Sequence, residues 1–281
     1  MNEQAGYPVS TGCELLGLSR SAYYYQAIEK DESELEAAIE EIAGQYPTYG
    51  TRRITQELRR ESHGIVVNRK RVHRIMAQKE LLIRKKKPKY GTTDSQHALQ
   101  RYPNLVKDLD IMHPEQVWVS DITYIRLQNE FVYLAVIMDV FTRAIRGWCL
   151  GRTIDQELTL TALRAALDTH TPKYHHSDQG LQYAAHTYTN LLKSRDVQIS
   201  MAAVGRPTEN GYAERLIRTI KEEEVNLSEY YDFEDAKHQI GHFIQDVYNS
   251  KRIHSSLGYL TPVEYEFAYR LTHIQTTPVS P

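Results

Sequence analysis

The 281-residue sequence contains only two cysteines, Cys13 and Cys149, which lie far apart in the chain. Two thiols are too few for a disulfide scaffold or for a four-ligand zinc site. Free cysteines are among the most often buried residues, so we expect both to be ordinary buried or half-buried thiols. The sequence therefore argues against a disulfide-rich secreted protein and against a zinc finger.

Long apolar runs are also lacking. The longest, Phe131 to Phe141, is interrupted by Asp139, and it is far shorter than the roughly 20 residues that span a bilayer. Met1 to Ser10 has neither the basic start nor the apolar run of a secretory leader. We therefore expect a cytoplasmic protein without membrane contact. Its length suits one large domain plus one or two small ones.

The formal net charge of −2 conceals an uneven distribution. Residues 1–110 hold 18 Lys and Arg against 15 Asp and Glu, whereas residues 111–281 hold 16 against 21. Within the first part, the stretch from Arg69 to Lys89 is strongly basic and contains the single acid Glu80. Such a cluster can neutralise several phosphates although the whole chain is slightly acidic.

Helical patterns dominate the first 84 residues. In residues 1–30, two short runs on either side of Gly17 fit a helix-turn-helix unit, although any small helical hairpin gives the same pattern. In residues 31–84, apolar stripes predict helices at Glu32–Ala43 and Thr51–Arg60, and a third that opens at Val67–Asn68.

The third of these helices is the best candidate for insertion into the major groove of DNA. Its basic side is formed by Arg69, Lys70, Arg71 and Arg74. The alternative is an ordinary solvated charged face. Residues 85–113, which begin with Lys85, Lys86 and Lys87, lack apolar periodicity, and we expect a basic linker that follows a DNA backbone.

From residue 114 the pattern changes to strands. Alternation at 117–124, a nearly continuous apolar run at 131–138 and a third run at 144–150 predict an antiparallel meander. Helix, strand, helix and strand follow at 156–168, 174–177, 185–195 and 197–201. This order predicts an α/β domain with a mixed sheet in residues 114–228. Helices are expected at 210–227 and 232–250. The second helix and the tail that follows it are expected to form a segment, residues 229–281, that packs on the core.

Three carboxylates stand out in this part of the chain. Asp121 lies in mid-strand, where a buried carboxylate needs a metal, a hydrogen-bond set or a cation. Asp178 ends a short strand, a location favoured by α/β sites. Glu214 shares a helical stripe with Arg218 and Lys221 at i+4 and i+7. An all-oxygen site of this kind suits Mg²⁺ or Mn²⁺, and two ions about 3.5–4 Å apart support phosphoryl displacement. Lys221 would point toward the same DNA.

Neighbouring polar residues have plainer interpretations. His175 and His176 fit strand-end packing better than metal binding, since the proposed ligands are hard oxygens. Asp139 fits a turn cap. Glu222, Glu223 and Glu224 are expected on a solvated face, away from Glu214. A last set of polar residues lies near the end of the chain: Asn249, Arg252 and His254. We expect them to fasten the C-terminal helix to the core, and direct contact with DNA is the alternative.

Three motifs resemble the acidic motifs of the retroviral-integrase superfamily. They are Trp118-Val119-Ser120-Asp121-Ile122-Thr123-Tyr124, His176-Ser177-Asp178-Gln179-Gly180 and Glu209-Asn210-Gly211-Tyr212-Ala213-Glu214. Asp178 and Glu214 are separated by 35 residues, the spacing of the superfamily's D,D-35-E signature. Lys221 matches the basic residue found seven positions after the glutamate.

More narrowly, the chain resembles the catalytic product of bacterial insertion-sequence transposases encoded in two overlapping frames. The segment Tyr46-Pro47-x-Tyr49-Gly50-x-Arg52-Arg53-Ile54 resembles their helical DNA-binding region, which adds Arg52 and Arg53 to the candidate DNA contacts. Tyr248-Asn249-x-x-Arg252-x-His254-x-x-Leu257-Gly258 resembles their C-terminal tail.

This resemblance implies an α/β, ribonuclease H-like mixed-sheet catalytic core preceded by all-α helix-turn-helix DNA-binding segments. It implies DNA cleavage and strand transfer at Asp121, Asp178 and Glu214 with two Mg²⁺ or Mn²⁺ ions. The expected partners are double-stranded DNA at element ends and target, further copies of the chain in a homo-oligomer, and the upstream-frame protein. The expected location is the bacterial nucleoid.

Two other functions use the same features. A structure-specific nuclease would hydrolyse DNA with the same carboxylates and never join strands, so only the reaction products separate it from a transposase. A DNA-binding regulator of transposition would keep the helical segments and lose the chemistry. The presence of all three acids argues against the regulator.

Overall fold

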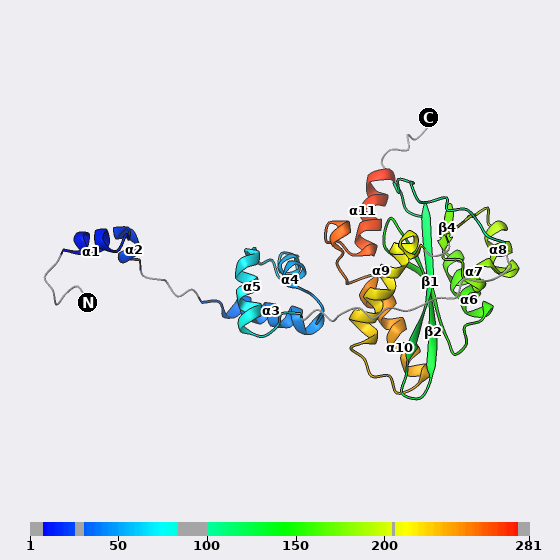
Figure 1. Ribbon diagram of the computed structural model, residues 1–281, viewed down its shortest axis with the longest axis horizontal. Coiled ribbons are helices and arrows are strands. Elements are labelled where there is room, and N and C mark those ends of the chain that lie inside the picture. The colour runs from blue at the N-terminus through cyan, green and yellow to red at the C-terminus, as the bar shows by residue number, and fades with distance from the viewer. Residues whose placement is uncertain (1–7, 26–30, 84–99, 204–205, 275–281) are drawn as a thin grey trace.

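The computed structural model describes residues 8–25, 31–83, 100–203 and 206–274. The predicted contacts Lys85, Lys86 and Lys87 lie outside the described residues. In Figure 1 a helical part lies to one side of a larger part built on a sheet. The helices of the first part are α1 (Val9–Leu15), α2 (Arg20–Tyr23), α3 (Ser33–Gln45), α4 (Thr51–Glu57) and α5 (Arg69–Gln78).

Helices α3, α4 and α5 form a unit with its own apolar core, as the stripes predicted. Ile39, Ile54 and Ile75, one from each helix, are completely buried in it. Asn68 caps α5, because its side chain accepts a hydrogen bond from the Lys70 amide at 2.8 Å.

The larger part contains a five-stranded mixed sheet in the order β3-β2-β1-β4-β5. Its strands are β1 (Val117–Arg126), β2 (Phe131–Asp139), β3 (Ile145–Gly151), β4 (Tyr174–Ser177) and β5 (Gln198–Met201). The first three pair antiparallel, as the short connections predicted, and β4 and β5 run parallel to β1. The expected α/β mixed sheet is confirmed.

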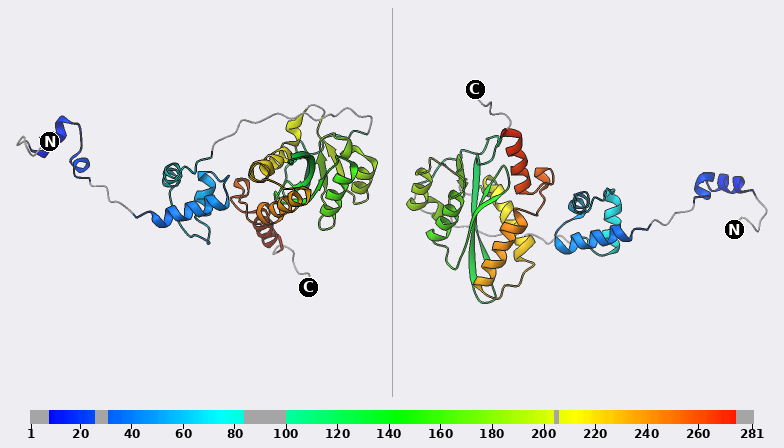
Figure 2. Two further views of the ribbon diagram at one scale, coloured as in Figure 1. Left: turned by 90° about the horizontal axis from the view of Figure 1, so that it is seen from below. Right: turned by 180° about the vertical axis from the view of Figure 1, so that it is seen from behind.

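Helices cover both faces of this sheet (Figure 2). One face packs on α6 (Gln156–Leu167), α7 (Leu181–Ala184) and α8 (His186–Lys193). The other packs on α9 (Gly211–Ile220) and α10 (Phe233–His242). Side chains of β1 alternate between these layers: Trp118 joins the first core, whereas Val117, Val119 and Ile125 join the second. Asp121 has the parity of Val119 and therefore faces the α9 side.

Both long helices on the α9 side end in π turns, which the sequence analysis did not anticipate. After a 3₁₀ turn at Pro207–Asn210, α9 ends at Ile220 and continues as a π turn at Lys221–Val225. Likewise α10 continues as a π turn at Phe243–Tyr248. Wider turns of this kind shift the side chains that follow relative to a regular α-helix.

The solvated face expected for the acidic run is wrong for two of its three residues. Glu223 is half-buried, and its carboxylate pairs with Arg252 at 2.6 Å and with Arg53 at 3.1 Å. Glu224 accepts hydrogen bonds from Ser228 and Tyr230. Only Glu222 is exposed.

A further helix, α11 (Pro262–Ile274), follows the expected helical segment and a 3₁₀ turn at Ser255–Leu257. The sequence analysis placed no helix here, although the signal is present. Thr261 and Glu264 form a capping box, in which the Thr261 hydroxyl accepts from the Glu264 amide and the Glu264 carboxylate accepts from the Thr261 amide. Pro262 occupies the first position, where a missing N–H costs nothing.

The polar C-terminal residues fasten this segment, as expected. Asn249 bonds to both backbone groups of Ile145 on β3, at 2.9 and 3.1 Å. The C-terminal segment also contacts the unit formed by α3, α4 and α5. Ile253 is fully buried in the core of that unit, and its amide donates to the Tyr49 hydroxyl at 3.0 Å. The helical unit is therefore docked on the C-terminal segment by apolar contact and hydrogen bonding.

Cys13 is buried and Cys149 half-buried, and both are free thiols. Among the helices that the structure describes, none combines the length and apolar character needed to cross a membrane.

Candidate active site

Asp121 lies in the middle of β1, on the face covered by α9. Its side chain is half-buried, and Oδ1 accepts a hydrogen bond from the Ile122 amide at 2.8 Å. Burial and the charges of Asp178 and Glu214 together raise the pKa of Asp121 to about 7, against the opposing Ile122 hydrogen bond. A carboxyl group with this pKa sits among other negative charges, which is the environment of a cation site.

Strand register brings Asp178 beside Asp121. On the parallel pair β1–β4, Val119 lies opposite His176. Asp121 lies two residues beyond this pair on β1, and Asp178 directly follows the end of β4. The charge of Asp178 acts on the carboxyl group of Asp121, so the two acids lie near one another.

Asp178 is held by the turn that follows it. Its Oδ1 accepts from the Gly180 amide at 2.9 Å. A Cβ at position 180 would lie 2.9 Å from the same Oδ1, closer than real Cβ contacts. The Asp178-Gln179-Gly180 sequence therefore needs glycine for close approach to the carboxylate.

Glu214 comes from α9, which packs on β1 through Ala213, Leu216 and Ile220. Glu214 is exposed beside this apolar stripe, and its charge acts on Asp121. The charges of Asp178 and Glu214 thus both act on the carboxyl group of Asp121, although the ligand atoms of these three acids do not lie within 4.8 Å of one another.

Residues just before α9 fix its start against the sheet, a role that sequence reasoning missed. The Asn210 amide group donates to the carbonyl of Ser120, next to Asp121, at 3.1 Å. The Glu209 carbonyl lies 3.2 Å from Nε2 of His176, and its carboxylate accepts from the Ala203 amide at 2.9 Å. The Glu209-Asn210 pair, already inside the third motif, was the available signal.

Lys221 occupies the first position of the π turn and is half-buried. Its Nζ lies 4.5 Å from the ring centre of Tyr124 on β1. Burial lowers the pKa of Lys221, and the charge of Asp121 opposes that change. Lys221 therefore lies within the electrostatic reach of the acids, whereas Arg218 on the same helix is exposed.

The two histidines beside Asp178 pack within the protein, as expected. His175 is buried, with Nε2 2.9 Å from the Tyr188 hydroxyl, and burial lowers its pKa to about 3. His176 places Nδ1 2.8 Å from the Ser200 hydroxyl. Asp139 caps its turn, because it accepts from the amide and hydroxyl of Thr142 at 2.8 and 2.6 Å.

The donor set of the acidic trio fits a hard divalent cation, since all its ligand atoms are carboxylate oxygens. A different set, Glu115, His170 and Glu266, is the one group among the described residues whose ligand atoms lie within 4.8 Å of one another. Arg146 already occupies that cluster, 2.5 Å from Glu115 and 2.8 Å from Glu266. We assign the cluster to ion pairing between α11 and the core.

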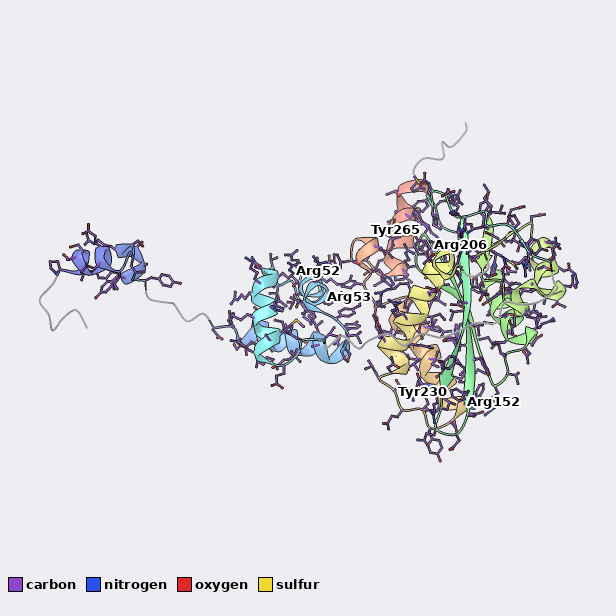
Figure 3. All side chains as sticks on the ribbon, in the orientation of Figure 1. Arg52, Arg53, Arg152, Arg206, Tyr230 and Tyr265 are labelled. Atoms are coloured by element: carbon purple, nitrogen blue, oxygen red, sulfur yellow. The ribbon has the colours of Figure 1, made fainter. Side chains whose placement is uncertain are left out.

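The predicted DNA contacts of the helical unit fall into two groups. Arg52 on α4 and Arg69 and Lys70 at the start of α5 are exposed. The others are engaged within the protein: Arg53 pairs with Glu223, and both Arg71 and Arg74 bind Glu32 at 2.6 Å. Figure 3 labels Arg52 and Arg53 on α4, the helix nearer to the core than α5. None of these residues contributes to the acidic trio.

The sheet of the larger part has the strand order β3-β2-β1-β4-β5. It carries one carboxylate on β1, a second directly after β4 and a third on α9, which packs against β1. Together these features define the class of this domain. It is an integrase-type core, the fold of enzymes that cut and join polynucleotides. Two families described as Integrase core domain match residues 111–207 and 195–262, and a family described as HTH-like domain matches residues 29–101.

Relatives similar along nearly the whole chain identify the family. The insertion element IS600 31 kDa protein of Shigella sonnei is 34% identical, with 92% of this chain and 98% of that protein covered. The transposase for insertion sequence element IS904 of Lactococcus lactis is 32% identical, with 86% and 96% covered. The chain belongs to the insertion-sequence transposases, DDE-type enzymes that bind DNA and depend on divalent metal ions.

Solved structures similar to the chain include the catalytic core domain of HTLV-2 integrase in complex with magnesium, at 17% identity and a TM-score of 0.41. That match covers 55% of this chain and 98% of the integrase domain. A simian T-cell lymphotropic virus intasome in complex with a PP2A subunit is 16% identical with a TM-score of 0.45, covering 87% of this chain and 76% of that chain.

Proposed function

We propose that Asp121, Asp178 and Glu214 bind two Mg²⁺ ions and form the site at which this transposase cuts element ends and joins them to target DNA. The observation that supports the proposal is the parallel pairing of β1 and β4, whose last printed pair, Val119 and His176, lies two residues before Asp121 and Asp178. The effect of both other acids on the pKa of Asp121 supports the same grouping. Mg²⁺ or Mn²⁺ suits this donor set.

Each side chain has a distinct part in this proposal. Asp121 and Asp178, which accept hydrogen bonds from the amides of Ile122 and Gly180, would hold the cations through their carboxylate oxygens. Glu214 closes the set from α9. Bound metal ions supply activation of a water or hydroxyl and stabilisation of the leaving oxygen. Lys221 adds a positive charge that favours a DNA phosphate beside the acids.

The test uses labelled element-end DNA with Mg²⁺ and the full chain. We expect Asp178→Asn to abolish strand cleavage while DNA binding persists. Asp168→Asn, an exposed acid that follows α6 on the opposite face of the sheet, is the matched control and should behave as wild type. Equal cleavage by wild type and Asp178→Asn would refute the assignment. Hydrolysed ends without any joined strands would favour the structure-specific nuclease.

We further propose that α5 presents Arg69 and Lys70 to the DNA. Both are exposed in the first turn of α5, which contains no acid. Cations there oppose the helix dipole, and a DNA phosphate would offset that cost. Replacing both by Ala should weaken DNA binding and flatten its dependence on salt by about 0.9 for each phosphate that is no longer neutralised. An unchanged salt slope would contradict this placement.

We also propose that the active form is a homo-oligomer on paired DNA ends in the nucleoid, with the upstream-frame protein as a partner. Helices α1 and α2 support an association surface, because Leu15, Leu16 and Tyr25 near them are 83%, 71% and 76% exposed. Mass measurements in solution, with and without element-end DNA, test this. A monomer in both conditions would contradict the proposal.

A further inference from the structure

A cavity of about 290 Å³ lies where the helical unit, the sheet and the C-terminal segment meet. We call it the arginine pocket, because each part contributes at least one arginine. Arg53 comes from α4, Arg143 from the turn between β2 and β3, Arg215 from α9, and Arg252 from the segment after α10. The lining also includes the ring of Tyr212 and the side chains of Ser255 and Ser256.

The carboxylate of Glu223 offsets only part of this charge. It pairs with Arg53 at 3.1 Å and with Arg252 at 2.6 Å. Among the residues that the structure describes, Arg143 and Arg215 have no carboxylate within 4.0 Å. The arginine pocket therefore keeps a net positive charge at the places where these two side chains line it.

The side chain of Arg143 is held in place at a conformational cost. Its backbone has a φ of 63°, a left-handed conformation that is unfavourable for a residue other than glycine. Its guanidinium lies 4.4 Å from the ring centre of Tyr212, and its buried Nε has no hydrogen-bond partner within the protein. A buried donor without an acceptor is unfavourable, whereas an anion in the pocket would accept from it. Strained residues of this kind cluster at functional sites.

The positive charge of the arginines affects the pKa of His254, which also lines the pocket. Burial and the charges of Arg252, Arg53 and Arg143 together lower the pKa of His254 to about 2. The imidazole is therefore neutral at physiological pH and adds no charge of its own. The local environment disfavours a further cation and favours an anion.

The pocket and the acidic trio lie on neighbouring stripes of one helix. Arg215 follows Glu214 directly, so the two side chains are about 100° apart around α9. Tyr212 and Thr219 share the pocket stripe, whereas Arg218 shares that of Glu214. The arginine pocket therefore lies beside the stripe of α9 that carries Glu214.

We infer that the arginine pocket binds one phosphate of the DNA backbone, a few nucleotides from the strand cleavage point, and thereby fixes the DNA against both the core and the helical unit. This inference rests on the proposed function. The volume of about 290 Å³ accepts a phosphate with part of its sugar and not a base pair. Arginine guanidinium groups bind phosphate oxygens in a bidentate manner. Such a contact positions DNA without reading its sequence.

The test measures binding of the full chain to a duplex of fixed, arbitrary sequence over a series of salt concentrations. The variant combines Arg143→Gly with Arg215→Gln. Glycine accepts the left-handed backbone at position 143, so the fold should be kept, and Arg215 is exposed. We expect the salt slope to fall by about 0.9, the value for a single phosphate, while the melting temperature is unchanged or higher. Arg195→Gln, an exposed arginine that follows α8 on the opposite face, is the control and should keep the wild-type slope.

A folded double variant with the wild-type salt slope would overturn the inference. The same result would leave the proposed function untouched. Conversely, a wild-type protein that binds DNA with the expected slope but shows no metal-dependent cleavage would overturn the proposed function alone. A slope that falls equally in the Arg195→Gln control would also overturn the inference, because the decrease would then report only total charge.

Discussion

At Asp121, burial and the charges of Asp178 and Glu214 raise the pKa of the carboxyl group from 3.8 to about 7. The unfolded chain would ionise near 3.8, so between these values the folded protein binds more protons than the unfolded chain. The free energy of unfolding therefore falls as pH rises from about 4 to 7, and the loss persists above pH 7. Ionised Asp121 therefore lowers the free energy of unfolding at neutral and higher pH, where its negative charge is needed for metal binding.

Replacement of Asp121 by Asn should remove this cost. We expect Asp121→Asn to stabilise the protein at pH 8 by on the order of 2 kcal/mol, given about 1.4 kcal/mol per pKa unit and partial solvent screening. At pH 4 the change should be near zero. Urea unfolding in the presence of a chelator measures both. Added Mg²⁺ should stabilise wild type at pH 8 and not the variant; parallel pH curves for the two proteins would contradict the assignment.

The glycine at position 180 gives a second prediction at this scale. A methyl group there would meet Asp178 Oδ1 at 2.9 Å and displace the carboxylate. A displacement near 1 Å at a reacting centre can cost about 10²-fold in rate, so Gly180→Ala should reduce strand cleavage by about that factor. Gly211→Ala at the start of α9 is the matched control, because nothing lies within 4 Å of its Cβ position. Equal activity of the two variants would show that Asp178 tolerates displacement.

Among the elements, the π turn after α9 carries Glu223, whose carboxylate pairs with Arg53 of the helical unit and with Arg252 of the C-terminal segment. Burial raises the pKa of Glu223, but hydrogen bonds and charges from Arg252 and Arg53 outweigh it and leave the pKa below its usual value. Arg252 is almost completely buried, with 3% of the residue exposed. Removal of a partner from such a pair leaves a buried charge without compensation.

Glu223→Gln should therefore destabilise the protein by about 3 kcal/mol. Glu222→Gln, on the exposed neighbour, should change stability by less than about 0.5 kcal/mol. Urea denaturation at pH 7 compares them. The depressed pKa of Glu223 also means that this stabilisation is present above pH 4.5 and is lost as pH falls through the folded value. Equal stability of the two variants would place Glu223 on a solvated face after all.

Elements differ in how well the sequence reveals them. Alternation at Val117–Tyr124 and the apolar run at Phe131–Met138 predicted β1 and β2, because a two-residue period is a local property of a strand. The π turn at Lys221–Val225 left no such trace, since its hydrogen bonds depend on tertiary packing. Helix α11 was missed although the capping box of Thr261 and Glu264 was there to be read.

The site shows the same division. The sequence order and spacing of Asp121, Asp178 and Glu214 were enough to select them. The pairing of β1 with β4, which makes the first two neighbours, is a long-range contact that no local pattern specifies. For the same reason the arginine pocket could not be found from sequence, because Arg53 and Arg215 are 162 positions apart and meet only in the folded chain.

At the scale of the whole molecule, the expected division between a core at 114–228 and a segment at 229–281 separates residues that share one apolar core. The α10 region contributes buried side chains to the same cluster as β1 and β2. These side chains are Tyr230, Phe233, Ala236, Ile240, Phe243, Ile244 and Tyr248. The helical unit depends on the same region, because its own core includes Ile253.

A fragment of residues 114–228 should therefore not fold, whereas residues 100–274 should. Burial of a large apolar side chain contributes roughly 1.5–3 kcal/mol, so loss of the α10 set removes on the order of 10 kcal/mol, comparable with the whole stability of a typical domain. Circular dichroism and urea unfolding of the two fragments provide the measurement. A cooperative transition in the 114–228 fragment would show that the sheet and α9 suffice. If the 114–228 fragment shows no cooperative transition and the 100–274 fragment does, the C-terminal segment is part of the catalytic core. The helical unit, whose own core includes Ile253 of that segment, is then docked on the catalytic core itself.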